Sequence, residues 1–85
     1  RSHCAGILLR EDQGEAPSYL FVAVNMYWQR EELGLPMLPQ GYVWRTVMDT
    51  FLPEPFPAEP APLTQQQHVL VRERSVQVLT ACKEA

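Results

Sequence analysis

Acidic side chains are the first residues in this chain that could do chemistry. The candidates for a pair of carboxylates are Asp49, Glu31, Glu32, Glu54 and Glu59. Such a pair hydrolyses a glycosidic bond when the two groups flank the sugar. The spacing of these residues fits no recognisable pattern of that kind, and a chain of 85 residues can hardly enclose the cleft that a sugar needs. We therefore expect no catalytic residues here.

Histidines and cysteines offer neither a nucleophile nor a metal site. His3 and His68 stand apart without a serine elbow, so we expect both at the surface. The sequence has no CxxC motif and no pair of histidines at ligand spacing, so we expect no zinc and no other cofactor. Cys4 and Cys82 lie near the two ends, where a disulfide is geometrically conceivable. We favour the alternative of two buried thiols.

Three aromatic residues could bind a sugar, because a pyranose ring presents a flat C–H face that stacks on an aromatic ring. They are Tyr27, Trp28 and Trp44. We expect Trp44 to fill the core, since large aromatic side chains are mostly buried. Tyr27 and Trp28 follow the end of a predicted strand. There we expect them to pack on a loop or a neighbouring domain, with sugar binding as the alternative.

The apolar pattern predicts an all-β fold. Strands are expected over residues 3–10, 19–25, 29–35 and 43–50 and in two further segments after residue 67, the last ending near residue 80. A bulge or turn at Arg74-Ser75 would explain the change of alternation between those two segments. No heptad or long helical pattern is present. The predicted architecture is a small Greek-key antiparallel β-sandwich of about six to eight strands.

Apolar side chains occupy both faces of the predicted strand 19–25, so one face should meet something larger. The predicted core consists of Leu20, Val22, Val24, Trp44, Met48, Val76 and Val78. The predicted partner-facing or sugar-contacting set consists of Phe21, Ala23, Asn25, Tyr27 and Trp28. An isolated chain should expose an apolar patch within this second set, or associate with itself through it.

Polar residues at strand ends have structural explanations. Asn25 and Asp49 are expected to close turns by accepting backbone N–H groups. Arg74 is expected to reach loop carbonyls or the Asp49 carboxylate, with a partner-facing ion pair as the alternative. Segment 51–67 holds five of the eight prolines and is predicted to be a loop. Its apolar side chains should pin it across an open face of the sandwich.

Length and charge exclude several classes of function. Eighty-five residues allow a single domain, 1–85. The net charge is −3 and no basic cluster is present, so nucleic-acid binding is not expected. No apolar run is long enough to span a bilayer, so no membrane partner is expected either.

Four sequence features, taken in their order along the chain, resemble those of a known protein family. Asn25 precedes Tyr27-Trp28, Leu35-Pro36 closes an apolar segment, the strand from Trp44 ends in Asp49-Thr50, and Arg74-Ser75 opens an alternating aliphatic strand. In this order the chain resembles the C-terminal β-domain of glycogen-debranching and isoamylase-type enzymes of the α-amylase family.

That resemblance implies a non-catalytic role. Enzymes of this family hydrolyse α-1,6-glucosidic branch points with three acidic residues on a preceding barrel, and none of those barrel motifs is present here. The chain would then be an accessory domain excised from a larger, cytoplasmic bacterial glycoside hydrolase, and it would pack on and stabilise the catalytic barrel of the same polypeptide. The alternatives are a carbohydrate-binding module for α-glucan and a protein-interaction domain that works through the proline-rich loop.

Overall fold

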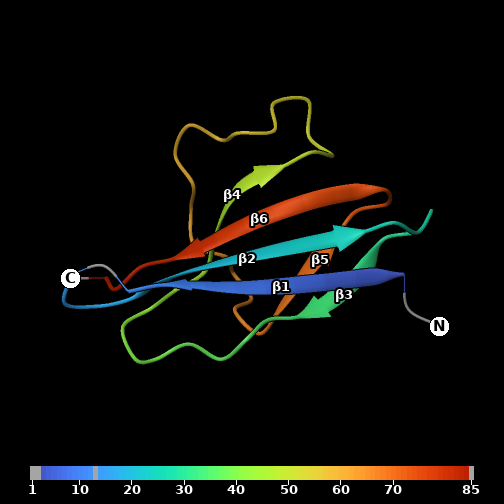
Figure 1. Ribbon diagram of the computed structural model, residues 1–85. Coiled ribbons are helices and arrows are strands. Elements are labelled where there is room, and N and C mark those ends of the chain that lie inside the picture. Colours follow the sequence, from blue (N-terminus) through green and yellow to red (C-terminus); the bar gives the residue numbers. More distant parts are fainter. Residues whose placement is uncertain (1–2, 13, 85) are drawn as a thin grey trace.

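Two antiparallel sheets make up the domain (Figure 1). The computed structural model describes residues 3–12 and 14–84, and in this part of the chain it contains six strands and no helix. The strands are β1 (Cys4–Glu11), β2 (Ser18–Asn25), β3 (Glu31–Gly34), β4 (Arg45–Asp49), β5 (His68–Val71) and β6 (Ser75–Ala81). The predicted fold class, a small all-β sandwich, is confirmed. Within the described residues, no helix is long and apolar enough to cross a membrane.

The larger sheet has the order β1-β2-β6-β4, and β3 and β5 form the smaller one. β1 and β2 make a hairpin, after which the chain crosses to the second layer as β3 and returns as β4. It crosses again as β5, and β6 then inserts between β2 and β4. The chain therefore crosses between the two layers several times, which ties them together. Only the connection after β4 is long.

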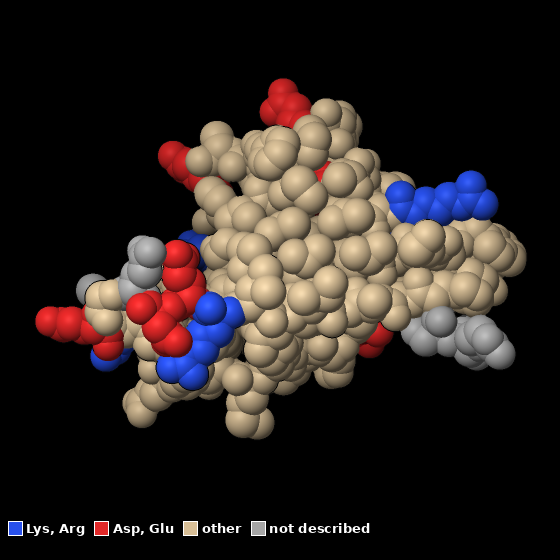
Figure 2. Space-filling view, in the orientation of Figure 1, with Lys and Arg blue, Asp and Glu red and all other residues tan. Residues whose placement is uncertain are grey.

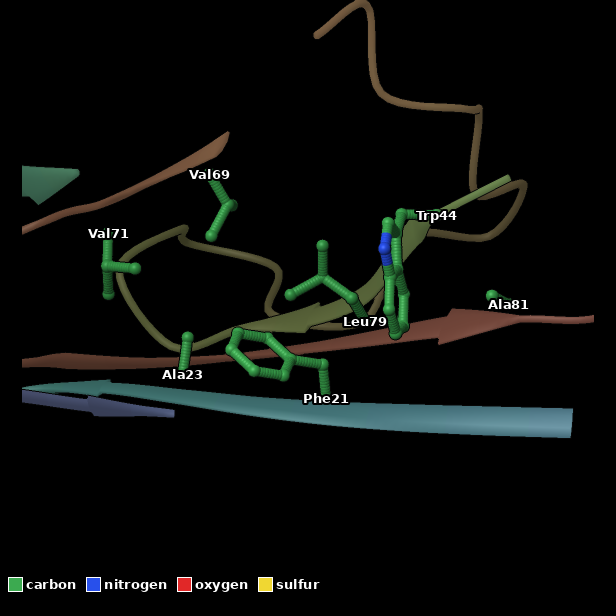
Figure 3. Close-up of a cluster of buried hydrophobic side chains, with 7 residues drawn as sticks. All are labelled: Phe21, Ala23, Trp44, Val69, Val71, Leu79 and Ala81. Atoms are coloured by element: carbon green, nitrogen blue, oxygen red, sulfur yellow. The ribbon is translucent and has the colours of Figure 1, made fainter. Parts of the chain in front are cut away.

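The core lies between the two sheets, on one side of β2 and β6 (Figure 3). Successive residues of a strand point to opposite faces, so every second residue of β2 and β6 reaches this layer. The buried hydrophobic residues are Phe21, Ala23, Trp44, Val69, Val71, Leu79 and Ala81. Of the predicted core residues, Trp44 is confirmed, with none of its surface exposed.

Most of the predicted core lies on the opposite face of the large sheet. Phe21, Ala23 and Asn25 are buried at 5%, 0% and 1% exposure, so their assignment to a partner-facing surface is wrong. The other predicted core residues are only partly buried and are absent from the core cluster: Leu20, Val22, Val24, Met48, Val76 and Val78. Both faces of β2 are apolar, and the pattern alone could not say which face the second sheet covers.

A β-bulge in β4 reverses the orientation of Met48. Thr46 pairs with Leu79 of the core face, but the register shifts after it, and Met48 pairs with Val78 of the other face. A bulge inserts one residue, which turns the following side chains to the opposite side of the sheet. The prediction that Met48 points inward with Trp44 is therefore wrong.

A tight turn joins β5 to β6 where the sequence predicted a bulge or a turn. Arg74 adopts a positive φ of 50°, and its amide donates to the Tyr27 carbonyl oxygen at 3.0 Å. The Arg74 side chain is exposed, and it forms no ion pair with Asp49 or any other described residue. The expected side-chain tie to Asp49 is wrong, and the backbone of the turn makes the connection instead.

The proline-rich segment between β4 and β5 is a loop, as predicted, and it extends beyond the edge strand β4 (Figure 1). Its backbone is fixed by the Leu63 amide, which donates to the Trp44 carbonyl, and by Pro60, whose carbonyl accepts from Arg45. Leu63 packs against the core, whereas Phe51 and Phe56 are exposed. The loop covers the edge of the large sheet rather than an open face.

Cys4 and Cys82 do not form a disulfide. Cys4 pairs with Asn25, and Asn25 pairs with Ser75 at the start of β6, whereas Cys82 follows the end of that strand. With a rise of about 3.3 Å per residue, the two thiols lie about 20 Å apart or more, which is far beyond bonding reach. Burial, with a smaller contribution from Glu31, raises the pKa of the Cys4 thiol. Cys82 is exposed, so the expectation of two buried thiols is wrong.

Gly6 is required by the ring of Phe21, which lies over β1. A methyl group at position 6 would overlap the Cζ and Cε1 atoms of that ring. We expect Gly6→Ala to lower the free energy of unfolding by about 2 kcal/mol, because a packed core resists added volume. Gly34→Ala is the matched control, since nothing lies within 4 Å of its added methyl group. Urea unfolding of both variants checks this; equal midpoints would contradict it.

Candidate functional site

One face of the large sheet is not covered by the second sheet and is largely apolar, and we call it the outer face. Its middle row crosses all four strands as Ile7, Val22, Val78 and Met48. Rows on either side add the remaining members, and the face consists of Ala5, Ile7, Leu9, Leu20, Val22, Val24, Met48, Val76 and Val78. These members are all aliphatic or Met, the register adds Thr80 and Arg45 at one end of the same face, and the described residues place no other layer over it.

The outer face is open to solvent and carries no charge over its middle. Ile7 and Leu9 are 54% and 51% exposed, and the remaining large members are partly exposed. Figure 2 shows an uncharged surface across the strands, with Asp, Glu, Lys and Arg at the margins of the view. Charged residues border this apolar surface at both ends: Glu11 and Arg45 at one end, by register, and Arg74 at the other, where it lines a hollow with Val24 and Val76. Arg45 is paired with Glu84 at 2.9 Å.

The first half of β6, residues 75–78, has the reverse polarity of an ordinary sandwich strand. Val76 and Val78 point to the outer face, and Ser75 and Gln77 point into the domain at 4% and 5% exposure. An antiparallel sheet with one face in water normally places polar side chains on that face. Residues 75–78 instead keep aliphatic side chains outside and polar ones inside, whereas the second half of the strand buries Leu79 and Ala81 and turns Thr80 outward.

The inward polar side chains bind the carbonyl groups of β5 and the turn that follows it. Gln77 donates to the Leu70 carbonyl at 3.1 Å and accepts from the Thr46 hydroxyl at 2.7 Å. Asn25 donates to the Val71 carbonyl at 3.1 Å. Within the described residues, no buried side-chain polar atom lacks a partner. Because these groups are satisfied, the reversed pattern of β6 costs the domain little.

Asn25 also builds the loop 26–29, which we call the aromatic loop. Its side-chain oxygen accepts from the Tyr27 amide at 2.8 Å, and its Nδ2 donates to the Gln29 carbonyl at 2.8 Å. The predicted turn at Asn25 is therefore confirmed. The predicted turn at Asp49 is confirmed as well, since Asp49 Oδ1 accepts from the Phe51 amide at 3.0 Å. That role accounts for Asp49 without any catalytic function.

The two aromatic side chains of this loop have different surroundings. Tyr27 is half-buried and stacks on His3, with ring centroids 4.5 Å apart. Trp28 contacts the Tyr27 ring at a centroid distance of 5.4 Å but is 62% exposed. A hollow beside Trp28 is lined by Gln29, Arg30, Arg72 and Glu73. Trp28 is therefore the one member of the predicted contact set that the structure leaves fully available to a ligand.

The acidic side chains and the potential metal ligands lie in different parts of the fold. Glu54 and Glu59 are exposed on the proline-rich loop, while Glu31 and Glu32 lie in β3 of the other sheet. His68 is exposed at the start of β5, at the surface as predicted. Over residues 3–12 and 14–84, no group of three His, Cys, Asp or Glu side chains could hold a metal ion.

Comparisons of the chain with protein-family models, with curated proteins and with solved structures found no match.

Sequence reasoning missed the members of the outer face on β1. Ala5, Ile7 and Leu9 alternate with Gly6 and Leu8, so the strand has no polar side to reveal its orientation. The orientation of β1 follows instead from the pairing of Gly6 with Ala23, which the sequence does not show. Two small residues side by side make room for the Phe21 ring, and that contact places the core on their face of the sheet.

Proposed function

We propose that this chain is a non-catalytic accessory domain that packs through its outer face on the body of a larger enzyme. The observation that carries the proposal is the aliphatic row Ile7, Val22, Val78 and Met48, which crosses the whole sheet without a charged residue. Contiguous exposed apolar surface of this kind marks interaction sites in soluble proteins. Burying it would add stability in proportion to the apolar area removed from water.

The resemblance, which spans residues 19–79, supports a particular partner. It suggests that the body is the catalytic barrel of a glycogen- or starch-debranching enzyme, with the α-1,6-glucosidic hydrolysis performed there. In this arrangement the domain contributes no reacting group. It shields apolar surface of the barrel and holds it in its folded form, and the partner belongs to the same polypeptide.

A pair of charged substitutions tests the packing role. Ile7→Glu and Val78→Glu together place two carboxylates on the middle row, separated by Val22. We expect the 85-residue chain to stay folded and to bind less of a hydrophobic dye, because both side chains reach solvent. In a polypeptide that joins this domain to its barrel, the same pair should shorten the thermal half-life of debranching activity at least severalfold.

The matched control carries the same charges away from the face. Leu52 and Phe56 are 45% and 70% exposed on the proline-rich loop, and Leu52→Glu with Phe56→Glu should leave the half-life unchanged. An unchanged half-life in the outer-face variant would overturn the packing role. A shortened half-life in the loop variant would instead favour the loop as the contact surface.

A further inference from the structure

A second surface, at the end of the sandwich where β2 and the β5–β6 turn meet, has the features of a ligand platform. The Arg74 amide in that turn donates to the Tyr27 carbonyl at 3.0 Å, so the turn and the aromatic loop are joined directly. Figure 1 shows the end of β2 and the start of β6 at the same end of the molecule. The outer face does not include this surface.

The aromatic loop is held in place before any ligand arrives. The Met26 amide donates to the His3 carbonyl at 3.0 Å, and the Asn25 side chain fixes both Tyr27 and Gln29. Tyr27 adds its stacking on His3. A large exposed side chain on a fixed loop loses little entropy on binding, and preorganisation of this kind raises affinity.

The side chains beside the Trp28 indole include both hydrogen-bond donors and a hydrogen-bond acceptor. Arg72 lies 4.4 Å from the Phe51 ring centroid and contacts Glu73 at 3.5 Å, so its guanidinium has a defined position. A hydrogen bond from its own backbone amide, with a smaller contribution from Arg72, lowers the pKa of Glu73, which is therefore an ionised acceptor at neutral pH. Gln29 and Arg30 complete the hollow.

This combination favours a neutral ring with several hydroxyl groups. A flat aromatic face accepts the C–H face of a pyranose, and a few placed polar groups fix its orientation. The attraction for a phosphate or carboxylate ligand is weaker than two arginines alone would give, because the Glu73 carboxylate lines the same hollow and offsets one of them. The open surface around Trp28 suits an internal ring of a chain.

We propose that Trp28, with Gln29, Arg30, Arg72 and Glu73, binds a pyranose ring of a neutral oligosaccharide. The proposal is independent of the packing role, since the outer-face variant Ile7→Glu with Val78→Glu should bind the sugar as the unaltered chain does.

Nuclear magnetic resonance titration of the 85-residue chain tests it, because the two indole N–H signals report separately. Maltoheptaose, an α-linked probe, or cellohexaose, a β-linked one, should shift the Trp28 signal in a saturable way, while the buried Trp44 signal stays fixed. Trp28→Ala should weaken binding about tenfold or more, read from the Glu73 backbone amide. Trp28→Phe should keep most of the affinity, and Phe56→Ala, which removes an equally exposed ring, should keep all of it.

The two probes assign the linkage, and saturation by either one supports the proposal. It is overturned if neither probe shifts the Trp28 signal at tens of millimolar, or if Trp28→Ala binds as well as the unaltered chain. Saturation by inorganic phosphate or ATP, with no response to either oligosaccharide, would also overturn it.

Discussion

Ala23→Lys should abolish folding, whereas Val22→Lys, one residue away, should leave the domain folded. Ala23 is fully buried between the sheets, so a lysine there would place an unpaired ammonium group in the core. Val22 lies on the outer face, where a lysine reaches water. We expect Val22→Lys to cost about 1 kcal/mol at most, as surface substitutions do. Circular dichroism and urea unfolding of both variants check the result.

Ala23→Lys and Val22→Lys control for each other, because the same residue is introduced into the same strand. Leu79→Lys and Val78→Lys repeat the comparison on β6, where the buried residue is again the odd-numbered one. A folded Ala23→Lys together with an unfolded Val22→Lys would show that the second sheet covers the opposite face.

Asn25→Leu should lower the free energy of unfolding by about 3 kcal/mol or more. The substitution removes the Nδ2 group that serves the carbonyls of Gln29, Val71 and Arg72 and the oxygen that serves the Tyr27 amide. Each buried backbone group left without a partner costs about 1–3 kcal/mol. A domain of this kind is stable by roughly 5–15 kcal/mol, so the loss is a large share. Thermal and urea unfolding measure it.

Asp49→Ala is the matched control for Asn25→Leu. Asp49 closes a similar turn, but its Oδ1 accepts a single exposed hydrogen bond, from the Phe51 amide. We expect a loss of about 1 kcal/mol there. If Asn25→Leu cost no more than Asp49→Ala, the buried network around β5 would contribute little, and the account of the reversed β6 strand would lose its support.

Local features of the fold could be predicted from the sequence, because they depend on neighbouring residues. A continuous apolar run predicted β2, alternating valines predicted β6, Asn25 and Asp49 predicted turns, and the prolines of 51–67 predicted a loop. The size of Trp44 predicted its place in the core, since large aromatic side chains are mostly buried. Each of these depends on propensity or size alone.

The orientation of the large sheet could not be predicted, since it depends on which face the second layer covers. In β2 both faces are apolar, and in β6 the aliphatic residues Val76 and Val78 lie outside while Gln77 is buried. A rule that places the most apolar face inside therefore selects the wrong face. The bulge in β4 also turns Met48 to the opposite face of the sheet, and no residue near Met48 in the sequence indicates a bulge there. The same reversed pattern in residues 75–78 is one of the observations that motivate the proposed contact role of the outer face.

The central claim is our proposal that a larger enzyme body covers the outer face, and thiol protection tests it most directly. Ile7→Cys places a reporter on the middle row, and Phe56→Cys places a reference on the proline-rich loop; both sites are exposed in this domain, at 54% and 70%. Both thiols should be alkylated readily in the 85-residue chain. In a polypeptide that includes the barrel, we expect the Ile7→Cys thiol to become protected while the Phe56→Cys thiol still reacts. Equal alkylation of Ile7→Cys in the short and long polypeptides would contradict the account.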